Sequence, residues 1–317
     1  MKVFYGLKGM THSFRRTVVT IGAFDGIHRA HQLILRRVIQ RARRLHGTSA
    51  LLTFDPHPLK VLQPDRSFFA LTCIEHRLHL LSHLGLDSCV VLKFSKRFSR
   101  LSAEAFIEEI LVKKLKVREI WVGFNYVFGK NREGTIRLLQ EYGRQYGFSV
   151  KKIPEIRMSG KRFSSTKIRQ LIAKGKLTEA SLFLGRPYSL YGKVVRGSGR
   201  GRRLGYPTAN LKPYHEALPP RGVYGVKAFL SPNKKGYLGL LNIGRRPTFG
   251  KNRTLTIEVH LLDFQGDLYG RKMEVAFLKR LRPERKFPNE ETLVEKIRRD
   301  EAVVRHLGPF WSKRSFR

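Results

Sequence analysis

Short apolar runs alternate with longer segments of helical periodicity along the first half of the chain. Five runs are typical of strands: residues 17–24, 48–54, 89–92, 118–124 and 149–153. Apolar residues at helical spacing predict helices over 28–45, 74–84, 103–115 and 135–146, and then over 165–173 and 177–184. Strands separated by helices of this length favour an α/β domain with a doubly wound parallel sheet. Ligands of such a sheet lie where strands end and helices begin.

The pattern changes at the Gly-Arg-Pro stretch 185–187. Beyond it, strand-like runs follow one another without an intervening helix, over 189–197, 222–230, 236–244, 254–264 and 273–281. Gly, Pro and Asn punctuate these runs, which is typical of a small antiparallel β-barrel. A helix over 290–305 closes this part of the chain. We therefore expect two domains, 1–185 and 186–310, followed by a basic tail at 311–317.

Charge is the unusual feature of the composition. The 317 residues include 63 Lys and Arg against 24 Asp and Glu, which gives a net charge of +39. The excess is spread along the chain, so nonspecific binding of polyanions is expected. A basic composition with solvated faces explains the charge equally well, and no specific nucleic-acid partner is predicted.

Neither export nor membrane insertion is indicated by the sequence. Its apolar runs are shorter than the roughly 18 residues of a membrane-spanning helix, and the N-terminal stretch lacks the apolar core of a signal peptide. Cys73 and Cys89 are too few for a disulfide framework or a four-cysteine metal site. We expect a cytoplasmic protein without a membrane partner.

Two histidines three residues apart, His28 and His31, open the first long helix. They share a helix face beside free backbone N–H groups, where phosphates bind well. Gly22 allows the chain to approach a ligand closely. Two other interpretations remain open from spacing alone: surface histidines at a helix cap, and half of a metal site.

Two further loops follow predicted strands. His57 lies between two prolines in 53–58, and the loop 122–135 carries two glycines beside Lys130 and Arg132. Rigid turns and glycine turns flanked by cations suit a phosphate ligand. An ordinary turn is an equally good interpretation of each.

The stretch 197–205 alternates glycines with arginines, which suits a polyphosphate. It lacks the Gly-Lys-Ser/Thr ending of a Walker loop, and an arginine-rich RNA-binding loop is the alternative. Thr208 and Asn210 then offer oxygen ligands for a hard cation such as Mg²⁺. Farther on, strand alternation puts Glu258 and His260 on one face, where a carboxylate can act as a general base. A surface glutamate is the commoner outcome.

Taken in order, these motifs resemble one family over nearly the whole chain, the bacterial bifunctional riboflavin kinase/FMN adenylyltransferases, also called FAD synthetases. The stretches that carry the resemblance are GAFDGIHRAH, TFDPHP, VGFNYVFGKNREG, SSTKIR, LGRPYSLYGKVVRGSGRGRRLGYPTANL, GVYGV, NIGRRPTFG, TIEVHLLDFQGDLYG and KFPNEETL. The resemblance implies a nucleotidyltransferase-like parallel sheet followed by a flavokinase-like barrel with a closing helix. Riboflavin, FMN, FAD and ATP would be substrates and products.

In the barrel, the resemblance implies transfer of the γ-phosphoryl group of ATP to the riboflavin 5′-hydroxyl, which gives FMN. Thr208 and Asn210 would hold Mg²⁺ and phosphate oxygens, and Glu258 would be the base. The glycine-arginine loop would close over ATP. Its nucleotide-binding positions are Gly197, Gly199, Gly201, Arg202, Gly205 and Pro207.

In the first domain, the resemblance implies that FMN phosphate attacks the α-phosphorus of ATP, which gives FAD and pyrophosphate. His28 and His31 would take the two histidine positions of an H-x-G-H signature and stabilise the developing charge. The residues that would hold nucleotide and flavin phosphates are Gly22, Phe24, Asp25, His57, Asn125, Ser164, Ser165, Thr166 and Arg169.

Three positions depart from the family pattern. Ala30 stands where the signature has glycine, Ala23 where asparagine is usual, and Tyr206 where phenylalanine is usual. A methyl group at position 30 crowds ATP, so we expect a weaker adenylyltransferase. One alternative is a riboflavin kinase whose first domain has lost adenylyl transfer. Another is a basic nucleic-acid-binding protein, which would have no use for a base and a pair of metal ligands.

Overall fold

The protein is described from a computed structural model that covers residues 1–10, 14–158, 160–196, 201, 205–214, 217–230, 235–246 and 254–312. It divides into two compact units, 1–70 with 74–165, and 71–73 with 166–317. In this division the helices α6 (Ser165–Ala173) and α7 (Leu177–Leu184) fall almost entirely in the second unit. The domain boundary expected between 185 and 186 stays a prediction.

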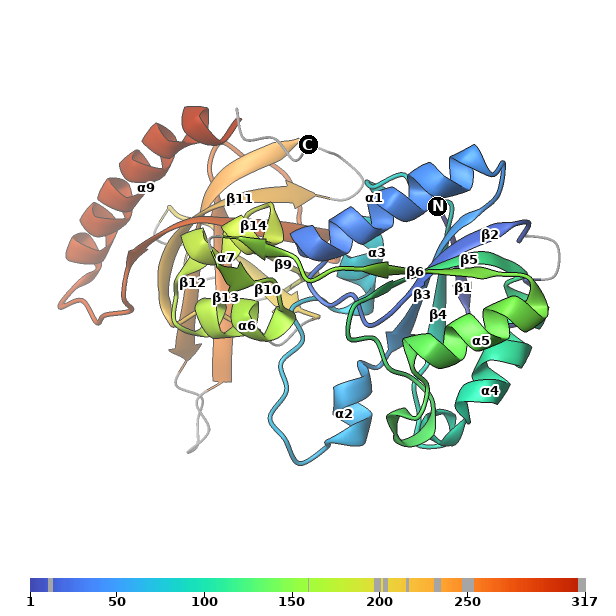
Figure 1. Ribbon diagram of the computed structural model, residues 1–317. Helices are drawn as coiled ribbons and strands as arrows, with labels where there is room; N and C mark the ends of the chain where they lie inside the picture. Colours follow the sequence, from blue (N-terminus) through green and yellow to red (C-terminus); the bar gives the residue numbers. More distant parts are fainter. Residues whose placement is uncertain are drawn as a thin grey trace. The chain divides into compact units, whose positions relative to one another are not determined.

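The first unit is built on a six-stranded parallel sheet with the strand order β1-β4-β3-β2-β5-β6 (Figure 1). The strands are β1 Lys2–Tyr5, β2 Thr17–Ile21, β3 Ser49–Asp55, β4 Ser88–Lys93, β5 Val117–Gly123 and β6 Ser149–Ile153. The predicted parallel sheet is confirmed. β1 was not predicted, because it is a four-residue edge strand whose apolar run, Val3 to Tyr5, is only three residues long.

Helices cover both faces of this sheet. α1 (Arg29–Arg44) and α3 (Ile74–Ser82) bury their apolar residues in one core cluster with Val18 and Leu51 of the sheet. The π-helical segment η2 (Phe106–Lys114) and α5 (Ile136–Tyr146) belong to the other cluster, with Val19 and Leu52. Neighbouring strand residues thus point into opposite cores, which explains why β2 and the first five residues of β3 are buried throughout.

Shorter elements connect these layers. They are α2 Pro58–Leu62, η1 Phe98–Arg100, α4 Ala103–Ala105, η3 Lys130–Arg132, and the antiparallel pair β7 Arg157–Met158 and β8 Lys161–Arg162. The helix predicted over 103–115 is therefore α4 continued by η2.

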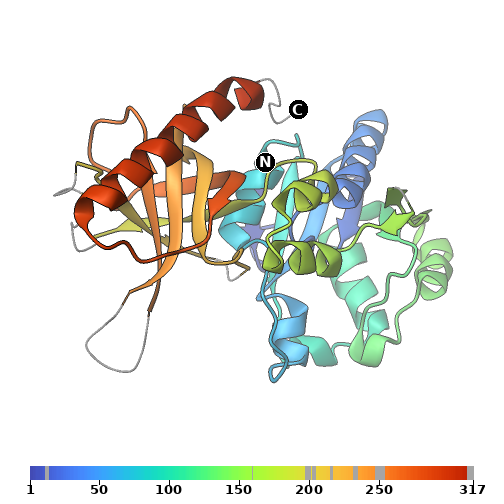
Figure 2. The same cartoon turned by 90° about the vertical axis from the view of Figure 1, so that its left-hand side faces the viewer.

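The second unit contains a closed antiparallel barrel with the strand order β10-β13-β12-β11-β14-β9 (Figure 2). Its strands are β9 Ser189–Val195, β10 Ala209–Pro213, β11 Gly222–Leu230, β12 Gly236–Arg246, β13 Thr254–Leu261 and β14 Lys272–Arg282. The predicted barrel and its closing helix, α9 (Glu290–Ser312), are confirmed, and α9 is longer than expected. The short β10 was missed because it holds Asn, Lys and Pro among its five residues.

The closing helix is packed tightly against the barrel. Val304 of α9 is fully buried in a cluster with Val223 and Leu240 of the barrel strands. A Cβ atom on Gly225 would lie 2.8 Å from Cγ2 of Val304, so the glycine makes room for the helix. Among the helices in the described ranges, none is long and apolar enough to cross a membrane.

Candidate active sites

The barrel contains a cavity of about 650 Å³ between its strands, the segment 283–289 and α9. Strand register brings three polar side chains together on the cavity side: Glu258 on β13 is opposite Asn210 of β10 and Asn242 of β12. Thr208, just before β10, and His260, two residues beyond Glu258, also line the cavity. The candidate base and both candidate metal ligands therefore face one space.

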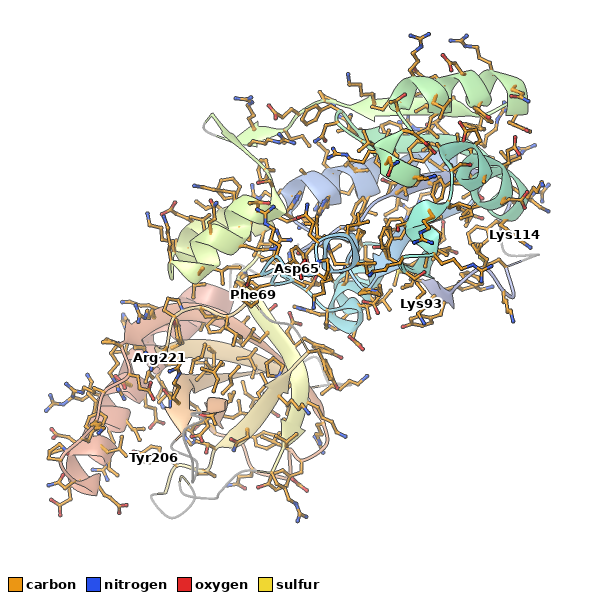
Figure 3. The ribbon with its side chains drawn as sticks, turned by 90° about the horizontal axis from the view of Figure 1, so that it is seen from below. Asp65, Phe69, Lys93, Lys114, Tyr206 and Arg221 are labelled. Atoms are coloured by element: carbon orange, nitrogen blue, oxygen red, sulfur yellow. The ribbon has the colours of Figure 1, made fainter. Side chains whose placement is uncertain are left out.

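Close backbone packing fixes the chain before β10. The ring Nδ1–H of His260 donates to the carbonyl of Pro207 at 2.9 Å, and the Tyr206 N–H donates to the Gly201 carbonyl at 2.9 Å. A Cβ atom on Gly201 would overlap the Tyr206 carbonyl oxygen and lie 3.0 Å from Oγ1 of Thr208. Tyr206, which is labelled in Figure 3, lies edge-on to the His260 ring and lines the cavity. Position 201 therefore requires a glycine, because a side chain there would collide with the backbone of Tyr206. The close packing of these two backbone segments positions the Thr208 hydroxyl.

The far side of the cavity combines cations with an aromatic ring. The guanidinium carbons of Arg282 and Arg285 lie 5.2 and 4.8 Å from the centroid of the Phe287 ring. Arg282 Nε donates to Asp300 of α9 at 2.7 Å, and both side chains are largely buried. A flat apolar face beside cations suits a planar ligand that carries phosphate.

These residues and Asn242 were not singled out from the sequence. Asn242 and Phe287 lie in the motifs NIGRRPTFG and KFPNEETL, whereas Arg282, Arg285 and Asp300 lie in neither. Only the strand register and the course of 283–289 show which of these side chains enter the cavity.

A second cavity, of about 210 Å³, lies in the first unit where β2, β3 and β5 end. Six residues expected to bind nucleotide line it: Gly22, Phe24, Asp25, His31, His57 and Ser165. Thr20, Ala23, Ile34 and Gly123 contribute to the same lining. The carboxyl edge of a parallel sheet is where ligands are expected, so position and residue types agree.

The turn between β2 and α1 has an unusual backbone. Phe24 and Ile27 have φ angles of 49° and 41°, a left-handed region that costs a non-glycine residue on the order of 1–3 kcal/mol. Side chains from elsewhere hold the turn: Ser165 Oγ donates to the Asp25 carbonyl at 2.9 Å, and Thr53 Oγ1 donates to the Ala23 carbonyl at 3.1 Å. Such strain persists where the surroundings fix it, and it concentrates at functional sites.

His28 and His31 form a stacked pair at the start of α1. The His31 backbone N–H donates to Nδ1 of His28 at 3.3 Å, so the neutral His28 ring carries its proton on Nε2. The two ring centroids are 3.6 Å apart with planes 14° from parallel, and the Phe24 ring stacks on His31 at 4.5 Å. His28 is only 5% exposed, so the interpretation as a surface histidine is wrong for it.

Burial lowers the pKa of His31 well below its ordinary value, and the nearby His28 and Arg77 lower it further. His31 is therefore neutral at neutral pH. Within the part of the chain that the structure describes, no group of three His, Cys, Asp or Glu side chains is placed to hold a metal ion. Among these described residues, the pair therefore lacks a third side chain placed to complete a metal centre.

The other sequence candidates are placed as follows. His57 caps α2, with its Nδ1 accepting the Leu59 N–H at 3.2 Å and its ring 4.4 Å from Phe68. The lining of the smaller cavity does not include His28, whose ring stacks on the lining residue His31. It also does not include Asn125, Ser164, Thr166 and Arg169, and the lining of the larger cavity does not include Gly205 and Pro207. Gly197, Gly199 and Arg202 lie outside the described residues.

Comparison with known proteins gives one consistent result for the two units. The family model for FAD synthetase matches residues 10–167, and that for riboflavin kinase matches residues 184–307. A bifunctional riboflavin kinase/FMN adenylyltransferase of Escherichia coli K12 is 37% identical over 308 residues, covering 97% of this chain and 98% of that one. Its counterpart from Listeria monocytogenes is 38% identical over 292 residues, covering 91% of each chain.

A solved structure has the same fold. It is a chain from Streptococcus pneumoniae described as a macrolide-efflux protein, with a TM-score of 0.82, 31% identity, and coverage of 96% of this chain and 99% of that one. The description as an efflux protein has no counterpart in either family model. Both family models and near-full-length relatives agree, and the chain belongs to the family of bifunctional riboflavin kinases/FMN adenylyltransferases.

Proposed function

We propose that the chain phosphorylates riboflavin to FMN in the barrel cavity and adenylylates FMN to FAD at the edge of the parallel sheet, with ATP as the donor in both reactions. The observation that carries this assignment is the register that places Glu258 between Asn210 and Asn242 in one cavity. The two cavities are formed by different units, so each reaction has its own machinery.

In the kinase reaction, the Glu258 carboxylate accepts the proton of the riboflavin 5′-hydroxyl as the oxygen attacks the γ-phosphorus of ATP. The bond to ADP breaks, and FMN leaves with the phosphoryl group. Phosphoryl transfer depends mainly on positioning and charge neutralisation, and Arg245 and Arg285 in the lining supply positive charge.

The donor set at the start of β10 fits Mg²⁺. Thr208 offers a hydroxyl oxygen and Asn210 an amide oxygen, and both hard ligands line the cavity. A side chain at position 201 would crowd the Thr208 hydroxyl, and Gly201 avoids this. These two residues would hold the cation together with phosphate oxygens. When bound, Mg²⁺ neutralises phosphate charge.

In the adenylyl transfer, a phosphate oxygen of FMN attacks the α-phosphorus of ATP, and the bond to pyrophosphate breaks. The Nε2–H of His28 and the free N–H groups of the first turn of α1 donate to the phosphate oxygens as charge develops. No covalent bond to the protein is needed. Asn125, Ser164, Thr166 and Arg169 are proposed to contact the nucleotide or flavin phosphates once these bind.

A paired assay tests the proposal. The purified protein is given ATP and Mg²⁺ with either riboflavin or FMN, and the flavins are separated by chromatography. We expect FMN from the first mixture and FAD from the second. FMN without FAD would instead support the kinase-only alternative, which Ala23 and Ala30 motivate. We place both reactions in the cytoplasm, where ATP is available, and keep 185/186 as the proposed domain boundary.

A further inference from the structure

Arg77 is a buried cation close to the smaller cavity but not part of its lining. It lies on α3, is 1% exposed, and hydrogen-bonds to residues of β3. Its Nη1 donates to Oγ1 of Thr53 and to the carbonyl of Phe54, both at 3.1 Å. Removing a guanidinium from water is costly, so its retention in the core calls for a specific use.

The hydrogen bonds of Arg77 continue into the strained turn. A guanidinium can only donate, so the Thr53 hydroxyl accepts from Arg77 and directs its own hydrogen to the Ala23 carbonyl, at 3.1 Å. Ala23 lines the cavity and precedes Phe24, whose backbone is left-handed and whose ring stacks on His31. Arg77 is therefore linked to the histidine pair through two hydrogen bonds, the peptide between Ala23 and Phe24, and the stacking of the Phe24 ring on His31.

The positive charge of Arg77 also acts electrostatically on titratable groups at and beside the cavity. It lowers the pKa of His31, and it opposes the burial that raises the pKa of Asp55. The titratable groups that face His31 are His28 on its own helix, Arg77 on α3, and Asp25 and His57 along the lining. The same positive charge that disfavours protonation of His31 also attracts an anion bound in the cavity beside it.

We propose that Arg77 is a positioning residue for adenylyl transfer, which holds the β2–α1 turn through Thr53 and supplies a buried positive charge that favours the triphosphate. The inference rests on the proposed adenylyl transfer in this cavity. It adds a residue to the site that neither the sequence motifs nor the cavity lining identify.

Three variants separate the effect of the positive charge of Arg77 from the effect of its hydrogen bonds. Arg77→Met removes both the charge and the hydrogen bonds, Arg77→Lys keeps the charge without the planar fork, and Thr53→Val breaks the link to Ala23 while keeping the charge. FAD formation is measured for each as kcat and KM for ATP across pH. Riboflavin phosphorylation by the same preparations is the internal control, because it belongs to the other unit.

For Arg77→Met we expect KM for ATP to rise about tenfold and the acid limb of the pH profile to move to higher pH, because His31 protonates more easily without the cation. Arg77→Lys should leave the limb in place. Thr53→Val should lower kcat about tenfold with an unmoved limb. Riboflavin phosphorylation should be unchanged in all three.

The titration of the His31 ring by nuclear magnetic resonance gives a readout that does not need activity. We expect its pKa to be higher in Arg77→Met than in the wild type and unchanged in Thr53→Val. Wild-type protein that makes no FAD would contradict the proposed function. Normal FAD formation with the same KM, pH limb and His31 titration in Arg77→Met would overturn the inference alone. A uniform loss of activity that follows thermal unfolding of the first unit would also overturn it.

Discussion

His28 caps α1 through one nitrogen of its ring, since Nδ1 accepts the His31 N–H. The proton of the neutral ring is then on Nε2, and under our proposal this N–H donates to a phosphate oxygen. The stacked ring of His31, sandwiched between His28 and Phe24, is kept neutral by burial and by its neighbours. Two side chains three residues apart thus have different environments, and spacing alone could not have distinguished them.

The lowered pKa of His31 predicts the pH dependence of FAD formation. Above this pKa the ring is neutral and the site is competent; as pH falls through it, the ring gains a charge and the geometry of the stack is disturbed. We expect kcat/KM to stay level down to the ordinary histidine value of about 6.5 and to fall only below it. A limb at or above that value in the measured profile would contradict this assignment.

Ala30 is the second residue of α1 and is partly exposed in its first turn. Replacing Ala30 with Gly removes the methyl group that departs from the family signature, so we expect faster FAD formation and a lower KM for ATP. Ala30→Ser, which adds an atom, should have the opposite effect. Steady-state kinetics with FMN and ATP measure both. Equal rates for wild type and Ala30→Gly would reject crowding at this position.

At the scale of elements, the periodic helices and buried strands were predictable because local patterns encode them. α1 shows the helical period over its whole length, and β2 and β3 are short, mostly apolar strands with little exposed surface. β1 and β10 were missed, because one is an exposed edge strand and the other is rich in polar residues. These strands are stabilised by hydrogen bonds to partner strands, and most of those partners are distant in the sequence.

The candidate sites were predictable in the same uneven way. Glu258, Asn210 and His28 could be proposed from the sequence because the family motifs single them out. Asn242 and Arg77 become candidates only through their neighbours Glu258 and Thr53, which are distant in the sequence. Strand register and the course of 283–289 decide which side chains meet, and neither can be derived from a period of two or of 3.6 residues.

The packing of α9 on the barrel gives a test at this scale. Gly225→Ala places a methyl group against Val304, which we expect to cost about 1–3 kcal/mol, and Val304→Ala alone should cost about 2 kcal/mol. The double variant should lose less than the sum, because the shortened side chain makes room for the added methyl. Urea unfolding measures all three, with the exposed Val303→Ala as a control near zero. Strict additivity would show that the two residues do not compete for space.

At the scale of the whole molecule, the chain joins two units that catalyse consecutive steps under our proposal, since the FMN made by one is the substrate of the other. The net charge of +39 exceeds what two phosphate sites need, and nothing in their geometry explains it. A field of this size acts on any polyanion near the surface.

Nonspecific polyanion binding is the expected consequence of that charge. Fluorescence anisotropy with two unrelated single-stranded DNA sequences should give similar affinities that fall steeply, and linearly on logarithmic axes, as salt concentration rises. Neutral dextran labelled with the same dye should not bind. Binding that prefers one sequence and persists at high salt would favour the nucleic-acid-binding alternative instead.

The central claim is that one chain holds two separate sites, and crossed variants test it most directly. Glu258→Gln removes the proposed base while keeping its shape, and His28→Asn removes the ring while keeping a residue that caps helices well. Rates of riboflavin-to-FMN and FMN-to-FAD conversion are measured for each variant under the same conditions. We predict that Glu258→Gln loses FMN formation by at least about a hundredfold with FAD formation intact, and that His28→Asn shows the reverse. Loss of both activities in either variant, with the fold preserved, would contradict the two-site account.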